Sequence, residues 1–223
     1  MDSKLFWRAM IRFACGVLLV GLLLFLPAGS FAYWQGWLLI GILFVPMFAA
    51  GLVMMAKSPE LLRRRLSAKE EQDEQKQVIA WSGLMFLVSF VLAGLNFRFG
   101  WLSLPRWLVW AAAALFLLGY LLYAEVLREN VWLSRTVEVQ EHQQLVDTGL
   151  YGIVRHPMYA ATLLLFLSMP LVLGSPVSFA VMLLYLPLIA KRIRNEELVL
   201  EQGLEGYAEY KKRVKYRVIP GIW

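Results

Sequence analysis

The chain has 223 residues, of which 60% are hydrophobic and 17% charged, and its formal net charge is +6. An ordinary globular chain is about 45–50% apolar, so this composition excludes a soluble domain. Several apolar runs reach the ~20 residues that a helix needs to cross a bilayer. The charges lie between these runs, which argues against nucleic-acid binding. The single cysteine, Cys15, excludes an intramolecular disulfide, and we interpret it as a packing residue within an apolar run.

Two apolar runs, about 11–26 and 34–56, open the chain. The first follows three basic residues and could be a signal peptide cleaved near 30–32. We favour an uncleaved span, because the later segments need its orientation. The second run contains Pro46, which kinks a membrane helix without forbidding it.

A charged connector follows at 57–77, and its Ser-Pro-Glu start at 58–60 predicts a helix, because serine caps a helix and proline fits its first turn. Three consecutive arginines at 63–65 indicate an edge that faces the lipid surface. Two further spans are expected at about 78–95 and 107–127. Tryptophans cluster near the connection between these spans, as aromatic residues do at a membrane interface.

A polar stretch, 128–156, separates these spans from two more apolar runs, about 158–173 and 177–190. Residues 131–140 within it are expected to be extended or to lie on the surface. The short Gly-Ser-Pro link between the last two runs predicts an antiparallel helical hairpin. Glu125, near the end of the fourth span, is either a boundary charge or a side chain that faces the bundle interior.

Successive loops along the chain are alternately rich and poor in Lys and Arg. Twenty lie in the N-terminus, the connector, the polar stretch and the tail, and the other loops hold only Arg98 and Arg106. By the positive-inside rule the basic side is cytoplasmic. We therefore predict an all-α integral membrane protein with about six transmembrane helices, or five if the first run is cleaved. Both termini and a short C-terminal helix would lie in the cytoplasm, and we expect a bacterial inner membrane.

The hairpin brings two polar segments together at the cytoplasmic face. The segment 145–159, LVDTGLYGIVRHPMY, places a cation, an imidazole and a phenol around Pro157, which can start a helix. The segment 190–200, AKRIRNEELVL, places an arginine and an acid four residues apart on one helix face. Each segment alone is typical of a solvated helix end. Together they suit a zwitterionic ligand with ammonium, carboxylate and ribose hydroxyl groups, and the candidate residues are Arg155, His156, Tyr159, Arg192 and Glu196.

Other site chemistries lack their motifs. The sequence has no P-loop, no G-x-G-x-x-G after a strand and no G-x-S-x-G. Two histidines and one distant cysteine do not predict a metal site.

The segment LVDTGLYGIVRHPMYAA, the acidic pair in RIRNEELVL and the tail GYAEYKKRVKYRVIPGIW together resemble the isoprenylcysteine carboxyl methyltransferase family, over about the last 80 residues. The resemblance implies an S-adenosylmethionine-dependent membrane methyltransferase, with a four-helix membrane region at 1–127 and a catalytic region at 128–223. It also implies a cofactor site at the cytoplasmic face. The acceptor would carry a carboxylate, prenylcysteine-like or otherwise lipophilic, and would enter from the bilayer among membrane lipids. The oligomeric state stays open.

The resemblance also implies roles for particular residues. Glu196 would hold the cofactor and Arg192 would bind the acceptor carboxylate, which makes both candidate catalytic residues. The family commonly has a histidine two residues before the Leu-Val pair, whereas this chain has Gln143 there and His142 one residue earlier. The implied cofactor-binding residues are Gln143, Gln144, Leu145, Val146, Tyr151, His156, Pro157, Met158, Tyr159 and Glu196.

Three alternatives accompany this interpretation. A phospholipid amine or small-thiol methyltransferase would use a similar arrangement, with Glu196 or Glu125 taking the proton. Membrane sterol reductases, which use NADPH, have a similar RHP-x-Y-like segment and tyrosine-rich tail. The Glu196-Glu197 pair and the short chain favour methyl transfer. A non-catalytic membrane scaffold is the third alternative.

Overall fold

A computed structural model describes residues 3–67, 73–133 and 137–223, and these residues form helices and connecting turns without a strand. The helices are α1 (Ser3–Ala28), α2 (Trp34–Lys57), α3 (Pro59–Ser67), α4 (Asp73–Phe99), α5 (Arg106–Glu129), α6 (Pro157–Val172), α7 (Pro176–Met182), α8 (Tyr185–Gly203) and α9 (Tyr207–Arg213), with a short 3-10 helix, η1, at Gly149–Gly152. The prediction of an all-helical protein is confirmed for these residues.

Among the described residues, five segments are long and apolar enough to cross a membrane: α1, α2, most of α4, α5 and the combined α7–α8 stretch Pro176–Gly203. The integral membrane character is thereby confirmed. The sixth predicted span is α6, a 16-residue apolar helix. At 1.5 Å per residue it is about 24 Å long, shorter than the ~30 Å hydrocarbon core. Much of α6 is buried between its neighbours, whereas α1 and α2 expose most of their apolar surface.

The last predicted span, 177–190, is not one helix. It breaks at residues 183–184, and α8 then continues to Gly203. Pro187 explains the break, because proline has no N–H to donate to the carbonyl of Leu183 four residues earlier. Residues 131–140 were expected to be extended or to lie on the surface. They form a turn at 131–132 and no regular element at 137–140, and residues 134–136 lie outside the described residues.

Glycines set the closest helix contacts in the bundle. A Cβ at Gly119 of α5 would lie 2.8 Å from Leu165 Cγ of α6, and one at Gly94 of α4 would lie 2.5 Å from the carbonyl oxygen of Leu24 in α1. Small residues of this kind let membrane helices approach closely. The resulting core joins α1, α2, α4, α5 and α6, with Phe116 fully buried within it.

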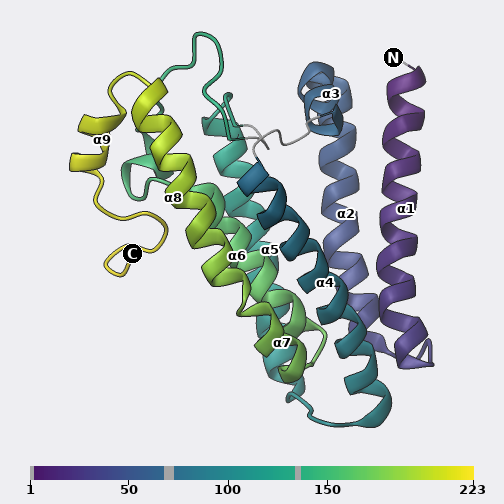
Figure 1. Ribbon diagram of the computed structural model, residues 1–223. Coiled ribbons are helices and arrows are strands. Elements are labelled where there is room, and N and C mark those ends of the chain that lie inside the picture. Colours follow the sequence, from purple (N-terminus) through teal and green to yellow (C-terminus); the bar gives the residue numbers. More distant parts are fainter. Residues whose placement is uncertain (1–2, 68–72, 134–136) are drawn as a thin grey trace.

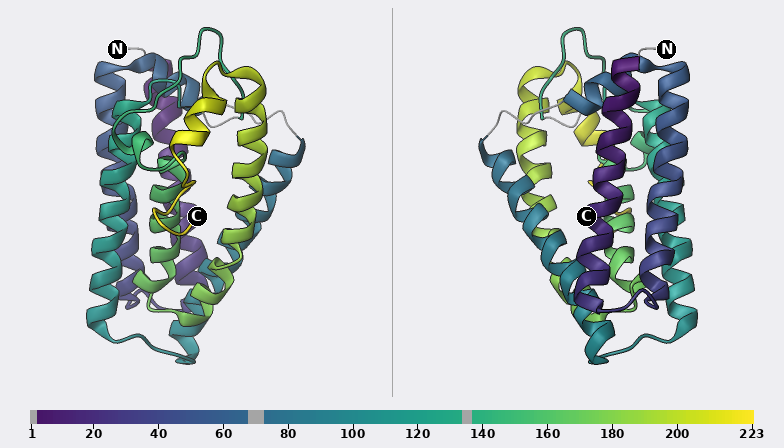
Figure 2. Two further views of the ribbon diagram at one scale, coloured as in Figure 1. Left: turned by 90° about the vertical axis from the view of Figure 1, so that its left-hand side faces the viewer. Right: turned by 90° about the vertical axis from the view of Figure 1, so that its right-hand side faces the viewer.

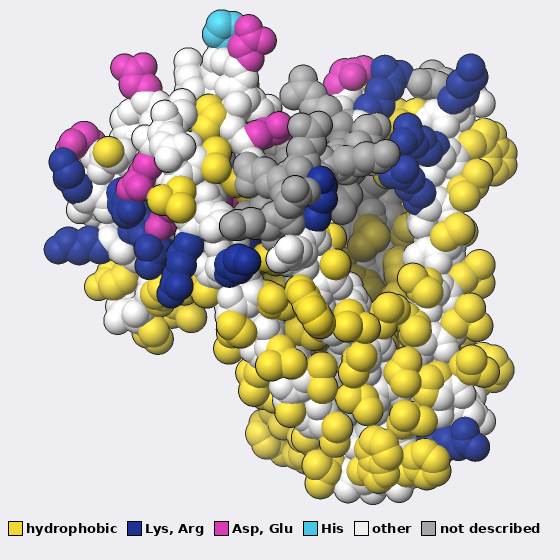
Figure 3. All heavy atoms as spheres, viewed as in Figure 1, with side chains coloured by type: hydrophobic (Ala, Val, Ile, Leu, Met, Phe, Trp, Pro, Cys, Tyr) yellow, Lys and Arg dark blue, Asp and Glu magenta, His cyan; other side chains and the backbone are white. Residues whose placement is uncertain are grey.

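The bundle has a charged end and an apolar body (Figures 1 and 3). The helices run side by side, and α3, α9 and the segment between α5 and α6 all lie at the charged end. Arg98 and Arg106 lie at the opposite end, where α4 finishes and α5 begins. After α9 the chain turns back along the bundle, so that residue 223 lies beside the helices (Figure 2). Cys15 is on the exposed face of α1.

Candidate active site

The turn before α6 is fixed to the end of α5. The Thr148 hydroxyl donates to Glu129 Oε1 at 2.9 Å, and the Leu150 amide donates to Glu129 Oε2 at 3.2 Å. Gly149 between them has φ +50°, and a side chain there would overlap the Glu129 carboxylate. Only glycine suits both the backbone conformation of this turn and the contact with Glu129.

Pro157 is the first residue of α6, as predicted from its fixed φ. The two residues before it pair with the returning chain. The Arg155 amide donates to the carbonyl of Tyr216 at 2.9 Å, and the His156 amide donates to that of Arg217 at 2.8 Å. Residues 214–223, called the tail below, thus hold the start of α6 in place.

A buried ion cluster centres on Glu197 of α8, whose side chain is 3% exposed. Arg155 Nε donates to its Oε1 at 2.8 Å and Arg217 Nε to its Oε2 at 2.9 Å. His156 Nε2 lies 3.3 Å from Oε1. Arg155 also donates through Nη1 to the carbonyls of Val214 and Lys215, at 2.7 and 2.8 Å. The predicted cation at Arg155 therefore ties α8 to the tail, and Glu197 and Arg217 are members of the site that the sequence did not single out.

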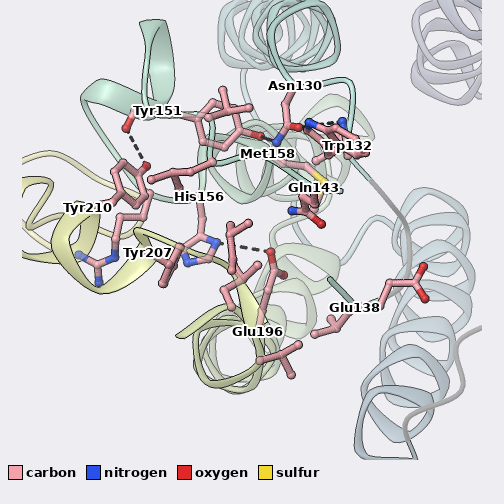
Figure 4. Close-up of a pocket in the computed structure, with 18 of the residues that line it drawn as sticks. Asn130, Trp132, Glu138, Gln143, Tyr151, His156, Met158, Glu196, Tyr207 and Tyr210 are labelled. Carbon is pink, nitrogen blue, oxygen red and sulfur yellow. Dashed lines mark hydrogen bonds and ion pairs between the residues drawn. The ribbon is translucent and has the colours of Figure 1, made fainter. Parts of the chain in front are cut away.

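The neighbouring acid, Glu196, turns toward a different set of groups. It accepts a hydrogen bond from the Tyr159 hydroxyl, which in turn accepts one from Arg192 Nε at 3.0 Å. His156 Nδ1 lies 3.7 Å from Glu196 Oε1 (Figure 4). Since His156 Nε2 lies 3.3 Å from Glu197 Oε1, the imidazole stands between the two carboxylates. The structure thus brings the four predicted groups His156, Tyr159, Arg192 and Glu196 into one network.

A cavity of about 820 Å³, its open mouth included, lies over this network (Figure 4). Every predicted site residue except Pro157 lines it; Pro157 is buried at the start of α6. The predicted residues in its wall are Gln143, Gln144, Leu145, Val146, Tyr151, Arg155, His156, Met158, Tyr159, Arg192 and Glu196. The residues that sequence reasoning missed are Asn130, Trp132, Leu133, Val137, Glu138, Val199, Leu200, Leu204, Tyr207 and Tyr210.

Tyrosines form one side of the cavity. The Tyr151 hydroxyl accepts from Asn130 Nδ2 at 2.8 Å, and the Tyr210 hydroxyl donates to the Tyr151 carbonyl at 2.7 Å. The Tyr207 side chain is buried, and its hydroxyl has no hydrogen-bond partner among the described residues. Burial raises the pKa of Tyr151 to about 12 and raises the pKa of Tyr207 and of Tyr210 above the ordinary value. All three phenols are therefore neutral at physiological pH. The Y-x-x-Y spacing at 207–210 was the only sequence signal for Tyr207 and Tyr210.

Two residues with open roles lie away from the cavity. Glu125 forms an ion pair with Arg128 at 2.6 Å and its side chain is 42% exposed, as a boundary charge would be. The His142 side chain is 88% exposed and points away on a turn with φ 59°. Gln143 takes the inward position beside it. No cluster of three potential metal ligands occurs among the described residues.

Comparison with known families finds a match in the part of the chain that builds this site. Residues 107–205 match the family model described as phospholipid methyltransferase. This match confirms the predicted resemblance: the region from α5 through α8 carries the pattern of the membrane methyltransferases that include the isoprenylcysteine carboxyl methyltransferase-like enzymes.

Individual relatives are more distant. A delta(14)-sterol reductase of Methylotuvimicrobium alcaliphilum is 27% identical over 136 residues, which cover 54% of this chain and 32% of the relative. The delta(14)-sterol reductase TM7SF2 of Mus musculus is 33% identical over 91 residues, covering 40% and 22%. The cobalt-zinc-cadmium resistance protein CzcN of Cupriavidus metallidurans is 30% identical over 129 residues, covering 57% of each chain. The chain therefore spans between about a fifth and three fifths of the length of these relatives.

Proposed function

We propose that this protein is an S-adenosylmethionine-dependent methyltransferase of the membrane, and that its cofactor binds in the cavity between α8 and the segment 130–159. The observation that carries the proposal is the network of His156, Tyr159, Arg192 and Glu196 in the wall of that cavity. It lies within the region that matches phospholipid methyltransferases. By the positive-inside rule the cavity faces the cytoplasm of a bacterial inner membrane.

The residues present fit this cofactor. The carboxylate of Glu196 suits an ammonium group, and the neutral Tyr207 hydroxyl, buried without a described partner, is suited to a ribose or carboxylate oxygen. Trp132, Leu200 and Leu204 offer apolar wall for an adenine ring.

In this reaction the main role of the protein is to position the acceptor relative to the cofactor. The bound cofactor supplies a methyl group on a good leaving group, and a carboxylate acceptor needs no base to attack it. Arg192 would orient the acceptor carboxylate through charge-assisted hydrogen bonds. Tyr159 links Arg192 to Glu196, so the acceptor side and the cofactor side of the site are held in one relative position. The Glu197 cluster keeps His156 and the start of α6 fixed below the cavity.

The acceptor we propose is a lipophilic carboxylate, prenylcysteine-like or similar, that enters between helices from the bilayer. A phospholipid amine or a small thiol is the alternative acceptor within the same reaction type. For these, Glu196 would take the proton, because it belongs to the hydrogen-bonded network in the cavity wall, whereas Glu125 does not line the cavity.

A second candidate function rests on a specific observation. Two relatives are sterol reductases, and a reductase would place a nicotinamide cofactor in the same cavity. The match of the region to a methyltransferase family is our reason to rank methyl transfer first.

Binding of S-adenosylmethionine and of NADPH to the purified protein in detergent tests both functions. We expect S-adenosylmethionine to bind to the wild type and to bind about 10- to 100-fold more weakly to Glu196→Gln, because a hydrogen bond to a charged group contributes about 1.5–3 kcal/mol. Glu205→Gln, an exposed acid between α8 and α9, is the matched control and should bind as the wild type does. Binding of NADPH alone would establish the reductase, and binding of neither would favour a scaffold.

A further inference from the structure

The tail has two faces of different character. Val214 and Val218 point inward and are buried, and Arg217 reaches Glu197. Outward lie Lys215, Tyr216, Ile219 and Ile222, which we call the tail patch. Tyr216 is 41% exposed, Ile219 44% and Ile222 78%. Three of these four residues are large and apolar or aromatic, although the tail follows the most basic part of the chain.

The tail lies where its exposed apolar side chains can reach the membrane. From α9, at the charged end, the tail turns back along the bundle beside the membrane helices (Figure 2). Figure 3 shows Lys and Arg side chains above a hydrophobic cluster on the side where α9 and the tail lie. Basic groups above apolar groups match the order of layers in a bilayer, from phosphate to acyl chain.

The basic residues in and near the tail differ in whether they form ion pairs. Lys211, Lys212 and Arg213 pair with Glu201, Glu209 and Asp147. Lys215 is exposed and forms no ion pair with any residue that the structure describes. The next residue in sequence is Tyr216, an aromatic residue of the kind found at membrane interfaces. A lysine here can keep its charge at the headgroups while its stem lies along apolar groups.

We propose that the tail patch inserts into the leaflet at the charged end of the bundle, with Ile219 and Ile222 among the acyl chains and Lys215 on the phosphate of an anionic phospholipid. The bilayer is the occupant we choose because the tail lies beside the membrane helices and Lys215 carries the opposite charge to such a lipid (Figure 2). Insertion requires no other protein.

The inserted tail also couples the bilayer to the site. The tail backbone accepts hydrogen bonds from both the side chain and the amide of Arg155, and from the amide of His156. A tail that is held at the membrane therefore keeps these two cavity residues in place. This second step rests on the proposed function, because it predicts that anionic lipid strengthens cofactor binding.

Lipid quenching in nanodiscs tests the insertion without any cofactor. The full chain with Cys15→Ala and Ile222→Cys is labelled with nitrobenzoxadiazole and placed in phosphatidylcholine, with or without phosphatidylglycerol, with a quencher on the acyl chain. We expect strong quenching at position 222 and little at a control label introduced by Glu205→Cys, in the exposed turn between α8 and α9. Equal, weak quenching at both positions would overturn the insertion.

Two lysine variants test whether Lys215 binds an anionic phospholipid. Lys215→Gln should shift the balance between inserted and withdrawn tail by about fivefold in the anionic discs and not in phosphatidylcholine alone. Lys57→Gln, an exposed lysine at the end of α2 on the other side of the bundle, should change nothing. If quenching at position 222 changes neither with phosphatidylglycerol nor with Lys215→Gln, the proposed binding of Lys215 to an anionic phospholipid is wrong.

The coupling is measured as S-adenosylmethionine affinity in the same discs. We expect tighter binding with phosphatidylglycerol, lost in Lys215→Gln, and equal affinity in all discs would overturn the coupling. If the cofactor does not bind at all, the proposed function fails, whereas the quenching at position 222 still decides the insertion.

Discussion

Tyr207 and Tyr210 lie on one helix, three residues apart, and differ in what their hydroxyl groups do. The Tyr210 hydroxyl donates to the Tyr151 carbonyl, whereas that of Tyr207 has no partner among the described residues. A buried polar group without a partner lowers stability. Because Tyr207 lies in the cavity wall, the proposed cofactor would supply the missing partner.

Tyr207→Phe should therefore weaken S-adenosylmethionine binding by about 1 kcal/mol, roughly fivefold, without lowering the thermal midpoint in detergent. Tyr210→Phe is the paired control, because it removes a hydrogen bond within the protein and should cost about 1 kcal/mol of stability. Loss of stability in Tyr207→Phe with unchanged cofactor affinity would show that the hydroxyl serves the fold instead.

Adjacent acids show where sequence reasoning succeeds and where it stops. Helical spacing placed Arg192 and Glu196 on one face, and a hydrogen-bonded Tyr159 does join them. The same spacing could not reveal that Glu197 is buried under two arginines, because Arg155 and Arg217 lie 42 and 20 residues away from it. Asn130 and Trp132 were missed for a similar reason: nothing in their neighbourhood indicates that the end of α5 meets the tyrosines.

At the scale of elements, the turn that leads to α6 depends on one glycine. Gly149→Ala would place a methyl group in the left-handed region and against the Glu129 carboxylate. Gly100, in the turn between α4 and α5, has a similar φ of +61° with nothing within 4 Å of a Cβ. Comparing the two separates backbone strain from the loss of the Glu129 contact.

We expect Gly100→Ala to cost about 1–2 kcal/mol, the strain of a left-handed alanine, and to leave cofactor binding unchanged. Gly149→Ala should cost more and should weaken cofactor binding as well, because the turn carries Tyr151 to the cavity. Thermal unfolding in detergent and a binding titration check both variants. Equal losses in the two variants would mean that the contact with Glu129 does not position the turn.

Helix boundaries were predictable where proline or charge marks them. Pro59, Pro157 and Pro176 each begin a helix. The break between α7 and α8 was not predicted, because the apolar run continues across it and only Pro187 marks it. The helices α4 and α8 extend beyond the apolar runs from which they were predicted, 78–95 and 177–190. The apolar run marks only the part of a helix within the bilayer, and the helix continues into the polar sequence outside it.

At the scale of the whole molecule, the Glu197 cluster joins three segments that are distant in sequence: the start of α6, the middle of α8 and the tail. Removing the acid would leave two arginines close together without their counter-ion. Such a loss is strongly destabilising for a buried pair.

Glu197→Gln should lower stability by about 3–5 kcal/mol. Glu201→Gln, one turn further along α8, breaks only the partly exposed pair with Lys211 and should cost no more than about 1 kcal/mol. Unfolding followed by heat or denaturant in detergent measures both. A small effect of Glu197→Gln would show that the three segments hold together without the cluster.

The all-helical membrane architecture could be predicted because apolar length and charge asymmetry are properties of single segments. The number of spans does not follow from apolar length alone, since α6 is apolar but short and its neighbours cover it. The division at residue 127, the direction of insertion and the partners remain predictions. These depend on the bilayer and on other molecules.

The pairing of Arg155 and His156 with residues 216 and 217 has a consequence for biosynthesis. The walls of the cavity come from residues 130–210, yet the start of α6 is fixed by amides and carbonyls made some 60 residues later. A ribosome that has inserted every apolar helix has thus still not delivered the groups that lock this turn. We therefore expect the cavity to reach its final structure only after the last membrane helix has been inserted. A nascent chain stalled at that stage would contain every membrane helix but not the hydrogen bonds that fix Arg155 and His156.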